Sequence, residues 1–240
     1  MRDISDCFVE WLSRHSIFIT QHQVSIFDQY FKELITWNEN LNLTSITDRT
    51  QVYEKHFFDS LSISLFAPLT KLLKLVDIGS GAGFPSIPLK IVYPQLQITI
   101  VDSLKKRIHF LEHLIEKLQL KGVTLIHGRA EDVARDHAHR ERYDIATARA
   151  VAKLNVLTEL CLPFVKVGGI FIAMKGPSVF DEIDEAARGV EILGGSRPIT
   201  HRLSLPNDNS ERHVLFYSKV KSSSSQFPRK AGTPAKTPLK

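Results

Sequence analysis

The sequence predicts an α/β fold: a mostly parallel sheet with helices on both faces, closed by a C-terminal antiparallel strand and preceded by a helical extension. A glycine-rich turn follows a short apolar run at 75–78, and short apolar runs alternate with helical segments from residue 72 onward. We expect the helical extension over 1–66, the sheet domain over 67–220 and a largely irregular, basic tail over 221–240.

The first 66 residues carry the pattern of amphipathic helices. Two sets of apolar residues fall at helical spacing, namely Ile4, Cys7, Phe8, Trp11 and Leu12, and then Val24, Phe27, Phe31, Leu34 and Ile35. The polar segment 38–42 ends the second helix, and Asp48 or Thr50 is suited to cap a third.

From residue 72 the spacing of the apolar residues changes, and short apolar runs alternate with helical segments. We expect strands at 73–78, 97–102, 123–127, 143–148 and 170–174, helices at 84–93, 105–119, 153–166 and 179–193, and two antiparallel strands near 198–205 and 212–220. In such a sheet, ligands bind beyond the carboxyl ends of the parallel strands, so residues that follow each strand are the candidates for a site.

The first strand ends in the glycine-rich turn. Asp77 is followed by Gly79, Gly81 and Gly83, which let the backbone turn sharply and pass close to a ligand. A dinucleotide site has the spacing G-x-G-x-x-G, but Phe84 occupies its third glycine position. The G-x-G-x-G spacing beside an acidic strand end resembles motif I of the S-adenosylmethionine (SAM)-dependent methyltransferases, which have a Rossmann-like fold.

Two further strand ends carry residues suited to a nucleoside. Asp102 lies at the end of the second strand, where a carboxylate can accept hydrogen bonds from two ribose hydroxyls or cap the next helix. After the third strand, the N–H of Ala130 and the carboxylate of Glu131 or Asp132 can bind a purine edge. The alternative is that these carboxylates complement a helix dipole.

Charged residues near the other strand ends leave several roles open. Arg149 follows the fourth strand and is suited to hold a methionine carboxylate, a substrate phosphate or Asp77. The basic run 105–107 opens a helix and is either an anion site or a solvated face. His56 and Asp59 lie one helical turn apart, so they either contact substrate or cofactor or form a local pair that pins the helices to the sheet.

Composition narrows the class of protein. No apolar run approaches the ~18 residues that a membrane-spanning helix needs, and the acidic start does not resemble a signal peptide. Cys7 and Cys161 lie far apart and form no metal-ligand pattern. We therefore expect a cytoplasmic protein without a membrane partner and without a metal.

The net charge of +5 is concentrated at the C-terminal end. Residues 219–240 include several Lys and Arg and no acidic residue, so the remainder of the chain is close to neutral. A basic tail on a near-neutral domain suggests a polyanionic partner such as nucleic acid, and a merely solubilising terminus is the alternative.

Several segments together resemble one protein family. They are 42–46, 56–61, 77–85, 128–131 and 147–151, and 228–236 is similar to that family's closing motif. On these residues the chain resembles the RsmG (GidB) family of bacterial methyltransferases, which act on N7 of a guanine in small-subunit (16S) rRNA. Ser86 departs from the glycine usual in the family, and 221–226 is a Ser-rich spacer before the closing motif.

The resemblance implies SAM as the cofactor and small-subunit rRNA or the 30S particle as the substrate. The implied SAM contacts are Gly79, Phe84, Ala130, Glu131 and Arg149, to which the strand-end argument adds Gly81, Gly83 and Asp102. We assign His56, Arg229 and Lys230 to the substrate and expect a monomer. No general base is expected, because N7 of guanine has a free lone pair and no proton, so catalysis can rest on positioning.

Two other functions remain open on the sequence. A SAM methyltransferase of a protein or small molecule fits the glycine turn but leaves the basic tail without a role. A non-catalytic RNA-binding ribosome-assembly factor with a relic pocket is disfavoured by the intact glycines together with Asp102 and Arg149. The tail is expected either to contact RNA or to fold back over the cofactor pocket.

Overall fold

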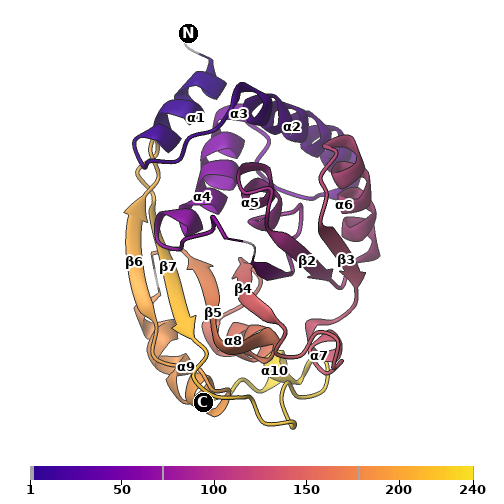
Figure 1. Cartoon of the computed structure of the whole chain (residues 1–240), viewed down its shortest axis with the longest axis vertical. Helices are drawn as coiled ribbons and strands as arrows, with labels where there is room; N and C mark the ends of the chain where they lie inside the picture. The colour runs from indigo at the N-terminus through magenta and orange to yellow at the C-terminus, as the bar shows by residue number, and fades with distance from the viewer. Residues whose placement is uncertain (1–2, 72, 178, 240) are drawn as a thin grey trace.

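A seven-stranded sheet lies between two layers of helices in the computed structural model, which describes residues 3–71, 73–177 and 179–239 (Figure 1). Its strands are β1 (Lys74–Ile78), β2 (Gln97–Asp102), β3 (Val123–His127), β4 (Tyr143–Arg149), β5 (Val165–Lys175), β6 (Ile199–Ser204) and β7 (Glu211–Ser218). The order across the sheet is β3-β2-β1-β4-β5-β7-β6. Strands β1 to β5 pair in parallel, whereas β7 runs antiparallel to both β5 and β6.

This architecture confirms the predicted Rossmann-like fold with its C-terminal antiparallel strand. One boundary was wrong: β5 begins at Val165, and the helix expected over 153–166 ends at Cys161. A short 3-10 helix containing Pro163 follows that helix, and Val165 then pairs with Tyr143 of β4. Proline has no backbone N–H to continue the helical hydrogen bonds, so the strand can start earlier.

Alternating strand residues supply the two hydrophobic cores of the molecule. Leu75 and Ile145 point into the first core, whereas their neighbours Val76 and Ala146 point into the second. The first core is covered by α1 (Ile4–Ser13), α2 (Gln21–Leu41), α3 (Arg49–Val52), the π-helix η1 (Tyr53–Phe58), α4 (Asp59–Leu61), the 3-10 helix η2 (Ser62–Leu65), α5 (Ser86–Val92) and α6 (Lys105–Lys117). The second is covered by α7 (Ala130–Val133), α8 (Leu154–Cys161), the 3-10 helix η3 (Leu162–Phe164) and α9 (Phe180–Ile192).

The N-terminal helices begin and end where local chemistry favours it. Thr20 and Gln23 form a capping box at the start of α2, each accepting the other's backbone N–H. The helix ends at Leu41, and its C-cap Asn42 adopts the left-handed conformation that asparagine tolerates. Because these helices share the first core with the sheet, they are fixed relative to the strand ends.

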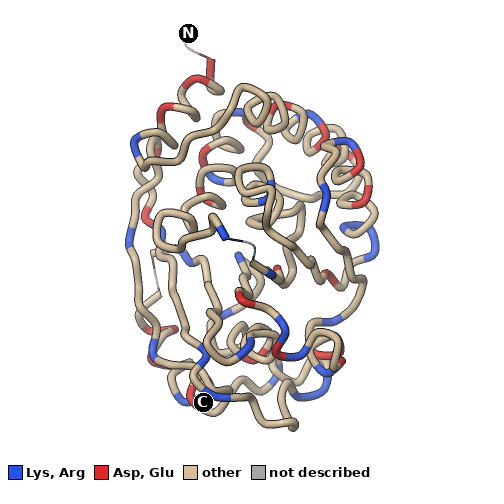
Figure 2. The backbone as a smooth tube through the Cα atoms, viewed as in Figure 1, with Lys and Arg blue, Asp and Glu red and all other residues tan. Residues whose placement is uncertain are grey.

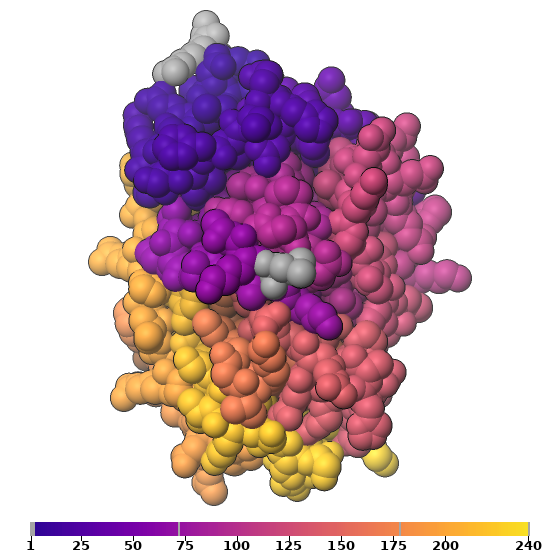
Figure 3. Space-filling view, in the orientation of Figure 1, coloured from indigo at the N-terminus to yellow at the C-terminus, as the bar shows by residue number. Residues whose placement is uncertain are grey.

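The C-terminal tail returns to the sheet domain after β7. Phe227 is buried in the second core, Leu239 packs against it, and α10 (Thr233–Lys236) forms near α8. Figure 3 shows this segment in yellow along the lower edge of the molecule. Basic and acidic residues are mixed over the chain in Figure 2. Among the described residues, no helix has the length and apolar character needed to cross a bilayer.

Candidate functional site

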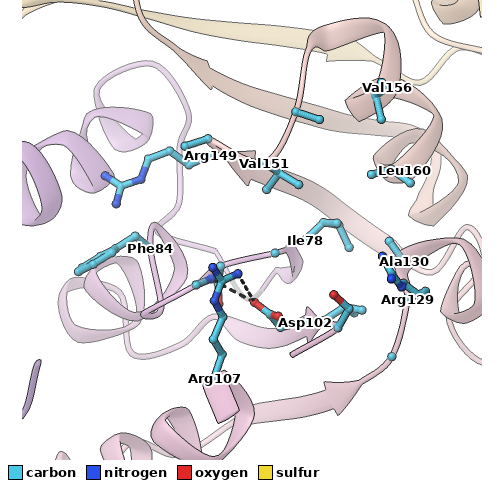
Figure 4. A pocket seen from close by; sticks show the side chains of 18 of the residues that line it. Ile78, Phe84, Asp102, Arg107, Arg129, Ala130, Arg149, Val151, Val156 and Leu160 are labelled. Atoms are coloured by element: carbon cyan, nitrogen blue, oxygen red, sulfur yellow. Dashed lines mark hydrogen bonds and ion pairs between the residues drawn. The ribbon is translucent and has the colours of Figure 1, made fainter. Parts of the chain in front are cut away.

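A cleft of about 500 Å³ lies beyond the carboxyl ends of β1, β2, β3 and β4. The strand order reverses between β1 and β4, which is where open α/β sheets bind their ligands. Of the residues predicted to bind cofactor, the cleft is lined by Gly79, Gly81, Phe84, Asp102, Ala130, Glu131 and Arg149, and His56 joins them. Figure 4 shows Phe84 and Arg149 on one side of the cleft and Ala130 on the other.

The glycines of the turn differ in what surrounds them. Gly81 has φ +62°, and a Cβ placed there would meet nothing within 4 Å, so this position faces the open cleft. Gly83 has φ +101°, and its Cβ would lie 2.7 Å from Ile87 and 2.9 Å from the Tyr30 hydroxyl. The structure therefore places Gly83 in the packing beneath the turn and not among the residues that line the cleft.

Asp102 connects the glycine turn to the start of α6. Its Oδ1 accepts the N–H of Leu104 at 2.9 Å, and its Oδ2 accepts the N–H of Gly81 at 3.3 Å. Arg107 from α6 lies 3.4 Å from the same Oδ2, as the dashed line in Figure 4 shows. The carboxylate thus fixes the turn and holds Leu104, the residue that precedes α6, while it remains at the edge of the cleft.

The tail closes the cleft on the side of α7. Glu131 Oε1 accepts the N–H of Gly232 at 2.8 Å, and Gly232, Pro234 and Ala235 line the cleft. Of the two alternatives for the tail, this geometry is that of a segment folded back over the pocket. It occupies Glu131 Oε1, one of the acceptors predicted to bind a purine.

Arg229 and Lys230, which we assigned to the substrate, lie outside the cleft lining. The guanidinium of Arg229 binds the fully buried Glu159, with Nε 2.9 Å from Oε1 and Nη2 2.5 Å from Oε2. Lys230 is exposed. Arg229 therefore anchors the tail in this structure.

Arg149 organises the opposite wall of the cleft. Its Nη1 donates to the carbonyl of Lys55 and to Asp59 Oδ2, each at 3.1 Å. Its Nη2 lies 3.3 Å from Nδ1 of His56, and the guanidinium stands 4.8 Å above the ring of Phe84. Arg149 therefore pairs directly with Asp59, not with Asp77, and fastens η1 to the end of β4.

His56 is packed into this wall as a neutral imidazole. Its ring stacks on Phe84 with 4.5 Å between centroids, and Nε2 lies 2.8 Å from Oγ1 of Thr44. Burial, and then the charge of Arg149, lower the pKa of His56 to about 3. His56 and Asp59 both bind Arg149, so the structure joins them through a third residue.

Two buried carboxyl groups lie behind the cleft. Burial raises the pKa of Asp59 above its ordinary value, although Arg149 and Arg212 both act to lower it. Burial also raises the pKa of Asp77 to about 7, and the carboxylate accepts the N–H of Ser86 at 3.2 Å. Asp77 therefore supports the first turn of α5 and does not contact the cleft directly.

Several residues that line the cleft were not among the assigned cofactor or substrate contacts. They are Thr44, Arg107, Gly232, Pro234 and Ala235, although Thr44 and the tail lie in segments that carried the family resemblance. Arg107 belongs to the basic run 105–107, whose other members are exposed. Among the described residues, no group of His, Cys, Asp and Glu is arranged to hold a metal.

Comparison with known proteins gives consistent results. The family model GidB, described as rRNA small subunit methyltransferase G, matches residues 23–214. "Ribosomal RNA small subunit methyltransferase G" of Halalkalibacterium halodurans is 51% identical over 232 residues, covering 97% of this chain and 98% of that protein. The protein of the same name from Staphylococcus aureus strain Newman is 49% identical over 235 residues, covering 96% and 98%.

Solved structures of similar fold include methyltransferases of low sequence identity. A SAM-dependent methyltransferase from Aquifex aeolicus matches with a TM-score of 0.54 at 16% identity, over 75% of this chain and 97% of that one. A SAM-dependent O-methyltransferase from Thermotoga maritima matches with a TM-score of 0.53 at 17% identity, over 78% and 71%. At this identity the likeness shows the fold alone.

Proposed function

The chain belongs to the GidB family, the small subunit rRNA methyltransferases G, and we propose that it transfers a methyl group from SAM to N7 of a guanine in 16S rRNA. The observation that carries this proposal is the near-full-length similarity to curated relatives, at about half identity, in a chain whose family segments meet at one cleft. We further propose that it acts as a cytoplasmic monomer on the rRNA or the 30S particle.

The residues of the cleft fit SAM. Gly81 leaves open space beside the turn, and Asp102 presents a carboxylate at the distance along the chain at which ribose hydroxyls are bound. We assign the ribose to Asp102, the adenine to the wall at 128–131, and the methionine end to Arg149 and Phe84. When bound, SAM supplies an electrophilic methyl group on a positively charged sulfur.

The proposed chemistry needs positioning and no proton transfer. N7 of guanine attacks through a lone pair that carries no proton, so the protein must bring the two reactants into line. The low pKa of His56 keeps it neutral at physiological pH, and its stacking on Phe84 makes it part of a rigid wall. We assign His56 and Arg149 to holding that wall in place beside both reactants.

Methyl transfer from radiolabelled SAM tests this function. The protein is incubated with unmodified 30S subunits, with protein extract or with buffer, and labelled rRNA is mapped by cleavage at N7-methylguanine. We expect label in one guanine of 16S rRNA only. Label in extract protein supports a protein methyltransferase, and no label in any sample supports an assembly factor.

Gly81→Ala is the matched control for that experiment. The added Cβ meets no protein atom but enters the cleft, and its φ of +62° costs a non-glycine residue about 1–2 kcal/mol. We expect this variant to remain folded by circular dichroism and to lose SAM binding. Wild-type affinity for SAM in Gly81→Ala would place the cofactor elsewhere.

A further inference from the structure

A second cavity adjoins the cofactor cleft beyond the end of β5 and beside the beginning of β7. This side cavity has a volume of about 490 Å³, within the range of about 300–1,000 Å³ typical of pockets for small ligands. His56, Arg149 and Ala150 line both the cleft and the side cavity. A group held in the side cavity therefore lies directly beside the cleft, next to Arg149.

Basic side chains outnumber acidic ones around the side cavity. Its lining includes the basic residues Lys55, Arg149, Lys175 and Arg212 and the acidic residues Asp59 and Glu182. Lys55 pairs with Asp208 at 2.9 Å and Lys175 with Glu182 at 2.8 Å, which leaves the two arginines with Asp59. Asp59 is shared by two guanidinium groups, with Arg149 at 3.1 Å and Arg212 at 3.3 Å. One carboxylate cannot neutralise two cations, so this part of the cavity favours an anionic ligand.

An exposed aromatic ring lies next to the side cavity. Phe180, the first residue of α9, is 63% exposed and meets His213 edge-on with 5.4 Å between ring centroids. His213 is itself a wall of the side cavity, and Pro177 and Glu182 on either side of Phe180 in the chain also line it. Phe180 therefore stands beside this cationic cavity with most of its surface accessible to solvent.

Many proteins bind single-stranded nucleic acid with aromatic side chains placed beside a positively charged groove. Bases stack on the ring, while Lys and Arg contact the phosphates. The N7 atom of guanine lies in the deep, narrow major groove of an RNA duplex, which side chains cannot enter. A guanine that is to react must therefore be unpaired or flipped out of its stack.

We propose that the side cavity receives the target guanosine of single-stranded RNA and that Phe180 stacks on an adjacent base. The inference rests on the proposed function, because it presupposes an RNA substrate. Arg212 then contacts the phosphate between the two nucleotides, while Arg149 lies at the junction of the two cavities, where N7 of the guanosine faces the cofactor cleft. Phe180 and Arg212 are thus substrate-binding residues that do not contact the cofactor.

Phe180→Ala and Phe180→Trp test the stacking contact. The measurements are the KM for 30S subunits, the Kd for SAM by calorimetry and the melting temperature. Loss of one stacked base predicts a rise in KM of about 5- to 100-fold for Phe180→Ala. The Kd and the melting temperature should not change, and Phe180→Trp should restore the KM because tryptophan also stacks. Ile199→Ala removes another exposed apolar side chain, from β6, and should leave the KM unchanged.

Arg212→Gln tests the phosphate contact through the salt dependence of 30S binding. Loss of one contact to single-stranded RNA should reduce the slope of log K against log salt by about 0.7. Arg197→Gln is the control, because Arg197 is an exposed arginine paired with Asp184 outside the side cavity. This variant should keep the wild-type slope.

The outcomes separate this inference from the proposed function. If the wild-type protein does not label 30S subunits, the proposed function fails. If it labels them and Phe180→Ala has the wild-type KM, the inference fails while the function stands. A Phe180→Ala defect seen with 30S subunits but absent with protein-free 16S rRNA would also overturn it, because Phe180 would then contact a ribosomal protein.

Discussion

The two ends of the chain both reach the cleft beyond β1 to β4, but different interactions hold them in place. The N-terminal layer, residues 3–66, contributes Thr44 and His56 to the cleft, and the tail, residues 221–239, contributes Gly232 and Pro234. Apolar packing fixes the N-terminal layer, whereas polar contacts fix most of the tail. This difference explains why one end was readily predicted and the other was not.

Phe57 shows how the N-terminal layer is fixed. It is fully buried, and its ring packs against those of Phe27, Tyr30 and Tyr53 with about 5 Å between centroids. Apolar residues of this kind recur at helical spacing, because a helix must present one face to the core. The spacing is visible in the sequence before any partner is known.

The tail is fixed by polar partners that lie far away in the sequence. Arg140 donates to the carbonyl of Phe227 at 2.6 Å and to that of Ser223 at 2.8 Å. Glu159 binds Arg229, and the ammonium group of Lys219 donates to two backbone carbonyls within the second layer. Such contacts follow no period, so composition alone described the tail as basic and irregular.

Phe57→Ala is expected to have the largest effect on stability. Truncating a buried phenylalanine costs about 3–5 kcal/mol, through lost burial and the cavity left behind. Urea denaturation measures this loss, and Phe18→Ala is the control because Phe18 is 78% exposed. A loss below about 1 kcal/mol for Phe57→Ala would mean that the N-terminal layer contributes little to the shared core.

Arg229→Ala should release the tail at a cost of about 3 kcal/mol. The substitution leaves Glu159 buried without its guanidinium, and breaking a buried pair from one side costs about 3–5 kcal/mol. We expect the lower figure because Arg229 is partly exposed. Denaturation and the rate of tryptic cleavage within 221–239 are the measurements. Lys230→Ala removes the neighbouring exposed charge and should change neither, and equal behaviour of the two variants would refute the anchoring role.

A chain truncated after Lys230 tests separately the two contacts of the tail, the Arg229–Glu159 pair and the residues that line the cleft. It keeps the Arg229 pair but lacks Gly232, Pro234 and Ala235. We expect SAM to bind about 10-fold more weakly, equivalent to about 1.4 kcal/mol, and the unfolding midpoint to change little. Calorimetry with SAM is the measurement.

The same truncation tests the alternative role of the tail in RNA binding. It removes the basic residues Lys236 and Lys240. If both contacted phosphates, the salt slope of 30S binding would fall by about 0.7–0.9 for each. We expect the slope to stay constant while SAM affinity falls. The reverse result would make the tail an RNA-binding segment.

The smallest expected effect is a pH dependence of the free energy of unfolding, caused by Lys219 just before the tail. Burial lowers the pKa of Lys219 from 10.5 to about 8. Between these two values the unfolded chain binds more protons than the folded one, so the free energy of unfolding rises with pH. The contribution of Lys219 to the free energy of unfolding is therefore complete above pH 10.5 and is lost as the pH falls toward 8.

Lys219→Met isolates that contribution, because methionine does not titrate. From pH 7 to pH 9, the wild-type protein should gain about 1 kcal/mol of stability relative to the variant, since one pH unit above the folded pKa corresponds to about 1.4 kcal/mol. Denaturation of both proteins at the two pH values gives the difference. A difference that does not change with pH would show that Lys219 has an ordinary pKa when folded.

The sequence predicted the backbone of the site better than its side-chain contacts. The G-x-G-x-G spacing requires a tight turn at the end of β1, and Gly79, Gly81 and Gly83 all have positive φ. Spacing does not reveal which glycine faces a ligand, because that depends on Tyr30 of a distant helix packing beneath Gly83.

Arg149 illustrates the same limit for charged residues. Its place at the end of β4 follows from the strand pattern, and in the structure it lines the cleft. Its partner Asp59 lies 90 residues earlier, at the start of α4 and directly after a π-helix that the periodic pattern did not predict. The side cavity was missed for a related reason, since one of its walls comes from 174–177 and 212–214, which carried no motif.

Hydrogen–deuterium exchange with and without SAM most directly tests whether the glycine turn and the tail form one cofactor site. The full chain is used, with NAD as the control ligand. SAM should slow exchange together in 79–84 and in 231–236, and NAD should slow neither segment. Slower exchange at the turn alone would contradict the closing role of the tail, and no change in either segment would contradict the assignment of the cleft to SAM.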